Sequence, residues 1–167
     1  MDDNEEPSST TIKLISRGGD AFELPYSAAR LSDIVVKSAD EIDGVEIPLP
    51  NVGKHALKKV VEFLKHYQDD RMEAIQIPLK DNTFDAVVTQ QWYQDFVKGL
   101  DQAMLFELVT AANYMNIQPL LDLANLKVSF LLSGKSAEEI RSILNIPVMT
   151  EADEVRTREE HPWMFDE

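Results

Sequence analysis

Cysteine is absent from this chain, and no secretory leader is visible at its start. None of the 167 residues is cysteine, which excludes a disulfide framework and a cysteine-ligated zinc site. The opening MDDNEEPSST is acidic and polar and lacks both the basic lead and the apolar centre of a signal peptide. These absences fit a reducing compartment, and we expect the protein in the cytoplasm and nucleus.

Basic residues are scarce as well. Sixteen Lys and Arg stand against thirty Asp and Glu, which gives a formal net charge of -14. This charge repels nucleic acid phosphates and anionic lipids, so neither nucleic acid nor a membrane is an expected partner. Pro119, Asp122 and Lys127 also break the most apolar stretch well short of the ~20 residues of a membrane span. An acidic chain of this kind is expected to bind basic surfaces on protein partners.

The motifs of common enzyme classes are missing: no G-x-S-x-G, H-E-x-x-H or G-x-G-x-x-G occurs. Gly134-Lys135-Ser136 resembles the end of a phosphate loop, but Ser129 stands where that loop needs its first glycine. His66 with Asp69 and Asp70 reads more simply as a helix end entering an acidic loop than as a metal site. We therefore expect no catalytic residues, cofactor or metal, and an acid hydrolase is kept as the enzymatic alternative.

The most apolar stretch of the chain runs from Asp101 to Leu132. A break between Asn116 and Pro119 divides it into two helical runs, and the second is apolar nearly all round. Two such helices in a small chain predict apolar surface left over for another polypeptide. The inward face of the first helix is marked by residues at helical spacing, namely Leu105, Leu108, Ala112 and Met115.

The residues before this stretch predict a mixed α/β domain. Residues 1–10 offer little to bury, and we expect a disordered tail there. Alternating residues over 11–16 and 21–24 flank a turn and predict a β-hairpin. A short strand is expected over 45–50, where the prolines confine it to a sheet edge or a strand end.

Helices and loops alternate through the rest of the chain. One helix is expected from Tyr26 to about Glu41, and a second from Lys54 to Tyr67 with Asn51 as its cap. Residues 68–89 are irregular and predict a long surface loop, whose isolated apolar residues are expected to dock in part. Further helix ends are marked by capping residues, namely Asp101, Gly134, Ser136 with Glu139 in a capping box, and Thr150.

Several short motifs make the chain distinctive, namely Ala111-Ala112-Asn113-Tyr114, Leu120-Leu121-Asp122, Glu138-Glu139-Ile140-Arg141, Asn145-Ile146 and Ile47-Pro48-Leu49-Pro50-Asn51-Val52. Together, and in the order in which they occur along the chain, these motifs resemble the S-phase kinase-associated protein one family, the adaptors of cullin and F-box ubiquitin ligases. The resemblance implies a BTB/POZ-type α/β fold over residues 11–132, with a small three-stranded sheet, packed helices and the surface loop 68–89. Residues 133–167 would form a C-terminal helical extension that binds the F-box.

The resemblance also implies a function. The chain would be the adaptor subunit of a cullin-RING E3 ligase, linking a cullin scaffold to F-box substrate receptors for protein ubiquitination. Its partners would be F-box proteins and the cullin N-terminal domain, and we expect a homodimer when no partner is present. Two alternatives stay open: an elongin C-like adaptor, which would end near residue 132, and a BTB-type homo-oligomeric scaffold.

Site residues follow from the resemblance position by position. Asn113 and Tyr114 resemble the cullin-binding part of the family surface, although a left-handed Asn and a core Tyr would explain them equally well. Most residues of the F-box side read individually as core, but Trp163 has little fold behind it. That side is Leu120, Leu121, Leu123, Val128, Leu131, Ile140, Ile143, Leu144, Ile146 and Trp163.

Two prolines depart from the family pattern. Pro147 lies in a segment that is one residue shorter than the usual form, and we expect the last helix to enter at a changed angle. Pro162 removes a backbone donor just before Trp163. The departure predicts an altered placement of this tryptophan.

Overall fold

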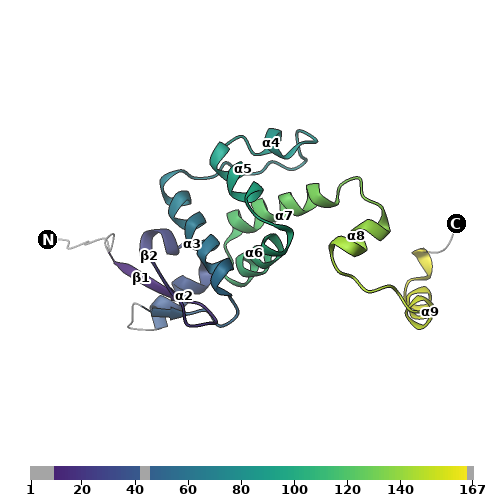
Figure 1. Cartoon of the computed structure of the whole chain (residues 1–167), viewed down its shortest axis with the longest axis horizontal. Helices are drawn as coiled ribbons and strands as arrows, with labels where there is room; N and C mark the ends of the chain where they lie inside the picture. Colours follow the sequence, from purple (N-terminus) through teal and green to yellow (C-terminus); the bar gives the residue numbers. More distant parts are fainter. Residues whose placement is uncertain (1–9, 42–45, 165–167) are drawn as a thin grey trace. The chain divides into compact units, whose positions relative to one another are not determined.

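The computed structural model describes residues 10–41 and 46–164 (Figure 1). The chain divides into two compact units, unit 1 up to Leu131 and unit 2 from Leu132 onwards. The acidic segment 1–9, where a disordered tail is expected, and residue 45 of the expected strand lie outside the described residues.

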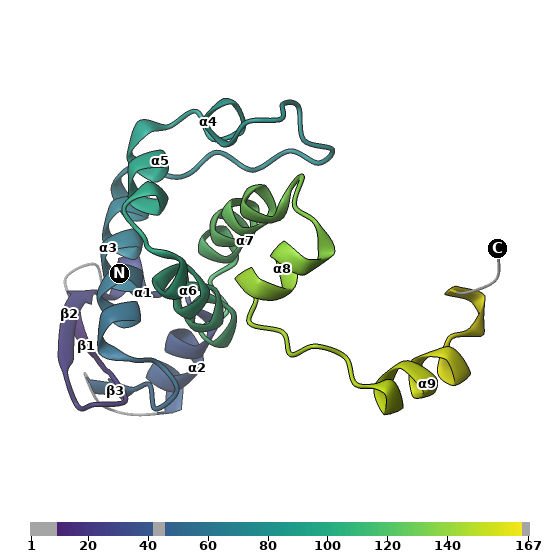
Figure 2. The same cartoon turned by 45° about the vertical axis from the view of Figure 1, so that its right-hand side comes forward.

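A three-stranded sheet forms one side of unit 1 (Figure 2). Its strands are β1 (Thr11–Ile15), β2 (Ala21–Pro25) and β3 (Glu46–Pro48), in the order β2-β1-β3. Strand β1 pairs antiparallel with β2 and parallel with β3. The predicted hairpin is thus confirmed, and the proline-bearing strand lies at an edge, where a missing amide donor costs no ladder bond.

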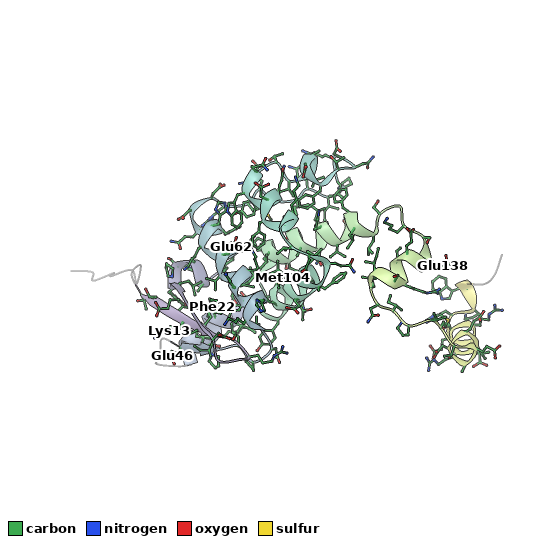
Figure 3. All side chains as sticks on the ribbon, in the orientation of Figure 1. Lys13, Phe22, Glu46, Glu62, Met104 and Glu138 are labelled. Atoms are coloured by element: carbon green, nitrogen blue, oxygen red, sulfur yellow. The ribbon has the colours of Figure 1, made fainter. Side chains whose placement is uncertain are left out.

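The strands alternate between the core and solvent as a sheet with one buried face requires. Ile12 and Leu14 of β1 are buried. Lys13 points to the other face, where its Nζ lies 3.8 Å from Glu23 and 3.6 Å from Glu46 on the two neighbouring strands (Figure 3). One lysine therefore links the three strands on the exposed face.

The single helix expected from Tyr26 to Glu41 is wrong in one respect, because two helices occupy this region. Helix α1 spans Tyr26–Ala29 and α2 spans Asp33–Glu41. The physical reason lies at Ser32, whose buried hydroxyl accepts from the amide of Val35, 3.4 Å away, at the start of α2. A serine that bonds to the backbone in this way favours a helix start over a helix interior.

The next helices pack on the sheet and on one another through aromatic rings. Helix α3 (Lys54–Asp69) lies between β2 and α6 (Figures 1 and 2), and α5 is Gln91–Lys98. The ring of Phe63 in α3 lies 5.8 Å from Tyr93 and 5.9 Å from Phe96 in α5. Such centroid distances are typical of favourable aromatic pairs, so this cluster holds α5 to α3.

The surface loop expected over 68–89 docks in part. It contains a one-turn helix, α4 (Phe84–Val87), with Phe84 and Val88 buried. The side-chain amide of Gln94 in α5 donates to the carbonyl oxygen of Val88, 2.7 Å away, and to that of Asp85, 3.2 Å away. A buried amide thus satisfies backbone acceptors that the irregular segment leaves open.

Helices α6 (Gln102–Tyr114) and α7 (Gln118–Leu132) follow. Asp101 caps α6 by accepting from the amide of Met104 at 2.7 Å, as predicted. Of the residues predicted for the inward face of α6, Leu108, Ala112 and Met115 lie in the core of unit 1, and Leu105 is also buried. Fully buried residues of this core include Leu14, Leu24, Ile47, Leu57, Leu64, Tyr93, Leu108, Met115, Ile117 and Leu120.

Unit 2 holds α8 (Ala137–Ile143), α9 (Glu151–Glu160) and the 3-10 helix η1 (Pro162–Met164). Ser136 and Thr150 each start a helix with a reciprocal capping box, through Glu139 and Asp153 respectively. Neither α8 nor α9 has a buried residue. The capping boxes satisfy backbone donors at the starts of these two helices, which have no fully buried side chain.

Candidate protein-binding surfaces

The α6–α7 junction, residues 113–117, ends one helix and starts the next within a few residues. Asn116 adopts the left-handed region at φ 50°. Its amide donates to the carbonyl oxygen of Asn113 at 3.2 Å, and the amide of Ile117 donates to that of Ala112 at 2.9 Å. This bonding pattern is a Schellman motif, and asparagine is one of the few residues that tolerates the required φ.

Helix α2 fixes this junction from the other side. The hydroxyl of Ser32 donates to the carbonyl oxygen of Met115 at 2.7 Å, and the side-chain amide of Asn116 donates to the carboxylate of Asp33. Ser32 and Asp33 were not among the residues predicted from the sequence. The pair stands directly before an apolar helical pattern and is a recognisable helix start, but no local signal links it to residues 83 positions further on.

The junction presents the two residues assigned to cullin binding. Asn113 is exposed, and Tyr114 is half-buried against the core. Met115 and Ile117, which flank the left-handed turn, have no exposed surface. An amide and a phenol ring are thus held at the surface by buried neighbours, which suits an interface that combines hydrogen bonds with aromatic contact.

The predicted F-box residues of α7 fall into two groups. Leu120 and Leu123 are both 0% exposed and belong to the core of unit 1, so they offer no surface to a partner. Leu121, Val128 and Leu131 are half-buried. Helical periodicity alone could not separate these groups, because α7 is apolar on nearly every face.

One flank of α7 is covered by the docked loop. The ring of Phe84 meets that of Phe130 edge to face, with centroids 6.1 Å apart. The ammonium of Lys127 lies 5.2 Å from the centroid of the same Phe84 ring, within reach of a cation-π interaction. Phe130 and Lys127 are therefore engaged within unit 1.

Helix α8 carries a short apolar stripe in unit 2. Ile140, Ile143 and Leu144 lie at helical spacing and are half-buried. The helix ends in a second Schellman motif, in which Asn145 has φ 52° and the amide of Ile146 donates to the carbonyl oxygen of Arg141 at 2.9 Å.

The two Schellman motifs differ in the residue that follows the left-handed asparagine. Ile117 is 0% exposed, whereas Ile146 is 48% exposed. The same local bonding thus anchors a helix end in unit 1 and leaves an isoleucine at the surface in unit 2. Apolar surface of this kind is available to another chain.

Trp163 lies in η1 and is 72% exposed. Pro162 is the first residue of this 3-10 turn, a position where its fixed φ is favourable and its missing amide donor costs no internal bond. The ring of His161 lies 6.3 Å from that of Trp163, edge to face. The tryptophan is therefore displayed on an ordered turn with most of its surface free.

Hydrogen bonds to the capping carboxylates shape the electrostatics of unit 2. The amide of Ser136, together with nearby Lys135, holds the pKa of Glu139 below its ordinary value. The hydroxyl and amide of Thr150 hold the pKa of Asp153 below its ordinary value. Both groups are ionised near neutral pH, where they stabilise the starts of α8 and α9.

The residues considered for metal binding form no such site in the described part of the chain. No cluster of three or more His, Cys, Asp or Glu side chains suited to a metal occurs among the described residues. The ring of His66 stacks on Trp92 with centroids 3.7 Å apart, and its Nε2 lies 3.7 Å from Asp70. Within the same ranges, every helix is too short or too polar to traverse a bilayer.

Comparison with known proteins identifies two matching family models. One, described as "Skp1 family, tetramerisation domain", matches residues 10–69. The other, described as "Skp1 family, dimerisation domain", matches residues 118–164. Together the two models match nearly the whole chain except residues 70–117, which lie in unit 1.

Curated relatives match the chain over almost its whole length. Suppressor of kinetochore protein 1 of Schizosaccharomyces pombe is 36% identical over 162 residues, covering 93% of this chain and 98% of the relative. S-phase kinase-associated protein 1 homolog of Tetrahymena thermophila is 35% identical and covers 95% and 96%. SKP1-like protein 1A of Arabidopsis thaliana is 37% identical and covers 95% and 99%.

Proposed function

The chain belongs to the Skp1 family and is an adaptor of cullin and F-box ubiquitin ligases, and we propose that separate surfaces serve its two kinds of partner. Membership of this family implies binding to F-box proteins and to cullins. The match of residues 118–164 includes α8 and α9, which an elongin C-like chain ending near residue 132 would lack.

The observation that carries the proposal is the lack of burial in unit 2. Helices α8 and α9 have no buried residue, yet this unit displays large apolar side chains. Ordering such residues costs conformational entropy, which burial against a partner offsets. The most exposed of them are Ile146, Val148, Met149, Val155 and Trp163.

We assign F-box contact to the residues with surface to offer. In α7 these are Leu121, Val128 and Leu131. Leu120 and Leu123 support α7 from the core and have no direct contact with the partner. In unit 2 the assigned residues are Ile140, Ile143, Leu144, Ile146 and Trp163. An obligate interface of this apolar kind buries about 2,000 Å² or more in total.

The cullin surface is assigned to the α6–α7 junction, with Asn113 and Tyr114 as its contact residues. The backbone around them is fixed by the Schellman motif and by the bond from Ser32 to Met115. A pre-organised surface loses little conformational entropy when a partner binds, which favours affinity.

The role is positional and not catalytic. The adaptor holds a substrate receptor and a cullin in one assembly, so the groups that react lie on other subunits. Tethering raises their local concentration without any bond being made or broken on this chain.

Co-purification tests the proposal. The baits are an F-box helical segment and a cullin N-terminal domain, offered to the intact chain and to a chain ending at Leu132. We expect the intact chain to retain both baits and the truncated chain to retain the cullin domain alone. Ile77→Ala is the matched control, because Ile77 is 89% exposed and lies outside both surfaces. Loss of both baits on truncation, or of neither, contradicts the assignment.

Self-association is the second function that the exposed apolar residues of unit 2 support. Without a partner, two copies would bury these residues against each other and form a homodimer. Sedimentation velocity of the free chain and of its F-box complex measures this. We expect a concentration-dependent dimer that disappears when the F-box segment binds, whereas a dimer that persists in the complex favours a BTB-type homo-oligomeric scaffold.

The cytoplasm and nucleus are the proposed compartments, because a chain without cysteine suits a reducing environment. Fractionation followed by immunoblotting would test this. Recovery of the chain in a secretory or membrane fraction would contradict it.

A further inference from the structure

A hollow of about 420 Å³ lies between α1 and the C-terminal end of α3 in unit 1. We name it the arginine pocket after Arg30 and Arg71, which both line it. Ser27, Tyr67 and Gln68 add two hydroxyls and a side-chain amide to the lining. The pocket therefore gathers two positive charges and several hydrogen-bond donors in a chain whose net charge is -14.

The guanidinium groups of this pocket are uncommitted within the described part of the chain, where neither Arg30 nor Arg71 forms an ion pair. Nearby carboxylates have other partners. Asp33 accepts from the side-chain amide of Asn116, and Asp70 accepts from Gln90 at 3.2 Å. Planar guanidinium groups bind carboxylates through paired hydrogen bonds, so the pocket is suited to a carboxylate-bearing ligand.

Helix polarity explains the arginines only in part. Arg30 is the C-cap of α1, and Arg71 follows the C-cap of α3. A cation at a helix C-terminus is favourable by itself. That effect does not require the two arginines to line one hollow together with Ser27 and Tyr67.

We propose that the arginine pocket binds the acidic side chains of segment 1–9 of the same chain. This segment carries Asp2, Asp3, Glu5 and Glu6 and not a single basic residue. The charges of the two sites are therefore complementary.

The point where the segment joins the fold supports this occupant. The carbonyl oxygen of Thr10 accepts from the amide of Tyr26 at 2.8 Å, and Tyr26 is the first residue of α1, which supplies Ser27 to the pocket. Glu6 lies four positions before Thr10, and four such steps span up to about 14 Å in an extended chain. Arg30 lies only about 6 Å along the helix from Tyr26, so the acidic residues can reach it.

The covalent link makes binding favourable even when each contact is weak. A short flexible tether gives an effective concentration in the millimolar range, which exceeds that of free acidic peptides in dilute solution. The contact is electrostatic and open to solvent, so salt should weaken it.

The test compares the full chain with a charge-neutral form, D2N/D3N/E5Q/E6Q, by NMR of the arginine Nε–Hε groups. We expect the Arg30 and Arg71 signals to shift between the two forms at low salt and to coincide at 0.5 M NaCl. Arg17, which lines a different hollow, is the matched control and should not move.

A peptide of residues 1–9 is then titrated into the charge-neutral chain. We expect it to shift the Arg30 and Arg71 signals towards their positions in the unmodified chain, and R30Q/R71Q to weaken this binding at least tenfold. Identical arginine signals in both full-length forms overturn the proposal. Equal peptide binding by the arginine variant also overturns it, as does a response to inorganic phosphate with none to the peptide.

Discussion

Tyr93 illustrates how a single buried polar group ties an irregular segment to a helix. Its side chain is fully buried, and its hydroxyl donates to the backbone carbonyl oxygen of Asp70, just after α3. Burial raises the pKa of Tyr93 well above its ordinary value of 10.0, and the charge of Asp70 adds to this effect. The folded state therefore favours the protonated, neutral form of the Tyr93 side chain.

Tyr93→Phe should lower the free energy of unfolding by about 1 kcal/mol at pH 7, because the carbonyl of Asp70 loses its donor. The folded-state pKa is raised, so the contribution of Tyr93 is fully present below pH 10.0 and is lost as the pH rises through the folded-state pKa. Urea unfolding at pH 7 and above pH 10 measures both effects.

The stability difference between the native chain and Tyr93→Phe should therefore shrink at alkaline pH. Tyr26→Phe is the matched control, since Tyr26 is also half-buried and its hydroxyl makes no hydrogen bond within the described residues. A difference that is constant with pH would contradict the account.

Ser32→Ala should weaken both the fold and the cullin surface. The substitution leaves the carbonyl oxygen of Met115 without its donor, which costs about 1–3 kcal/mol for a buried acceptor. Loosening of the α6–α7 junction should then lower affinity for the cullin domain. Ser129→Ala is the control, because the Ser129 hydroxyl bonds only within its own helix. Unfolding and cullin titration of both variants test this, and an unchanged cullin affinity in Ser32→Ala counts against the role of the junction.

Capping residues were predictable from the sequence where the cap acts locally. Asp101, Ser136 and Thr150 cap the helices that follow them, as expected. Asn51 does not, because α3 starts at Lys54 with Gly53 as its cap. The bond from Ser32 to Met115 could not be predicted, since it joins residues that only the tertiary fold brings together.

At the scale of elements, α8 depends on its capping box more than on packing. It is short, has no buried residue and begins with the reciprocal bonds between Ser136 and Glu139 at 2.8 and 3.2 Å. Isolated helices of this length are marginal in water, so the cap has a large share in its stability.

Acid should therefore weaken α8. The hydrogen bond from the Ser136 amide lowers the pKa of Glu139 from its ordinary value of 4.5. The contribution of Glu139 to stability is therefore present above pH 4.5 and is lost as the pH falls through the lower folded-state pKa. Glu139→Gln should remove this transition, because glutamine accepts the same bond without titrating. The amide shift of Ser136 followed from pH 6 to pH 2 measures it.

Glu138→Gln is the control for this titration. Glu138 lies in the first turn of α8 but outside the capping box (Figure 3). The Glu138→Gln variant should keep the Ser136 transition. A transition that survives in Glu139→Gln and disappears in Glu138→Gln would show that the charge of Glu138 acts on the helix dipole and that the capping box is not the cause.

Elements with a clear period were predictable, and those without one were not. The alternation around Leu14 and the helical spacing of Leu105 and Leu108 correctly predicted the strand and helix that carry them. The docking of α4 depends on Gln94, a polar residue whose burial follows from its bonds to Val88 and Asp85 and not from any pattern. Which residues of α7 are buried could not be predicted either, because the helix itself carries apolar residues on nearly every face.

At the scale of the whole molecule, the two units differ in what stabilises them. Unit 1 has a core drawn from its sheet and helices, whereas the helices of unit 2 are capped but not buried. The short motifs allowed the family and fold to be predicted, because they mark the junction, α7 and α8. The sequence alone did not show which residues of these motifs are exposed, because that depends on which of them lie in the core.

The central claim is that cullin and F-box partners use separate surfaces, and calorimetric titration of two exposed-residue variants tests it most directly. Asn113→Arg should weaken cullin binding and leave F-box binding unchanged. Trp163→Ala should do the reverse, with a loss of about 2 kcal/mol, or roughly thirtyfold, as for an interface hot spot. Two variants that each weaken both partners equally, or neither partner, would contradict the account.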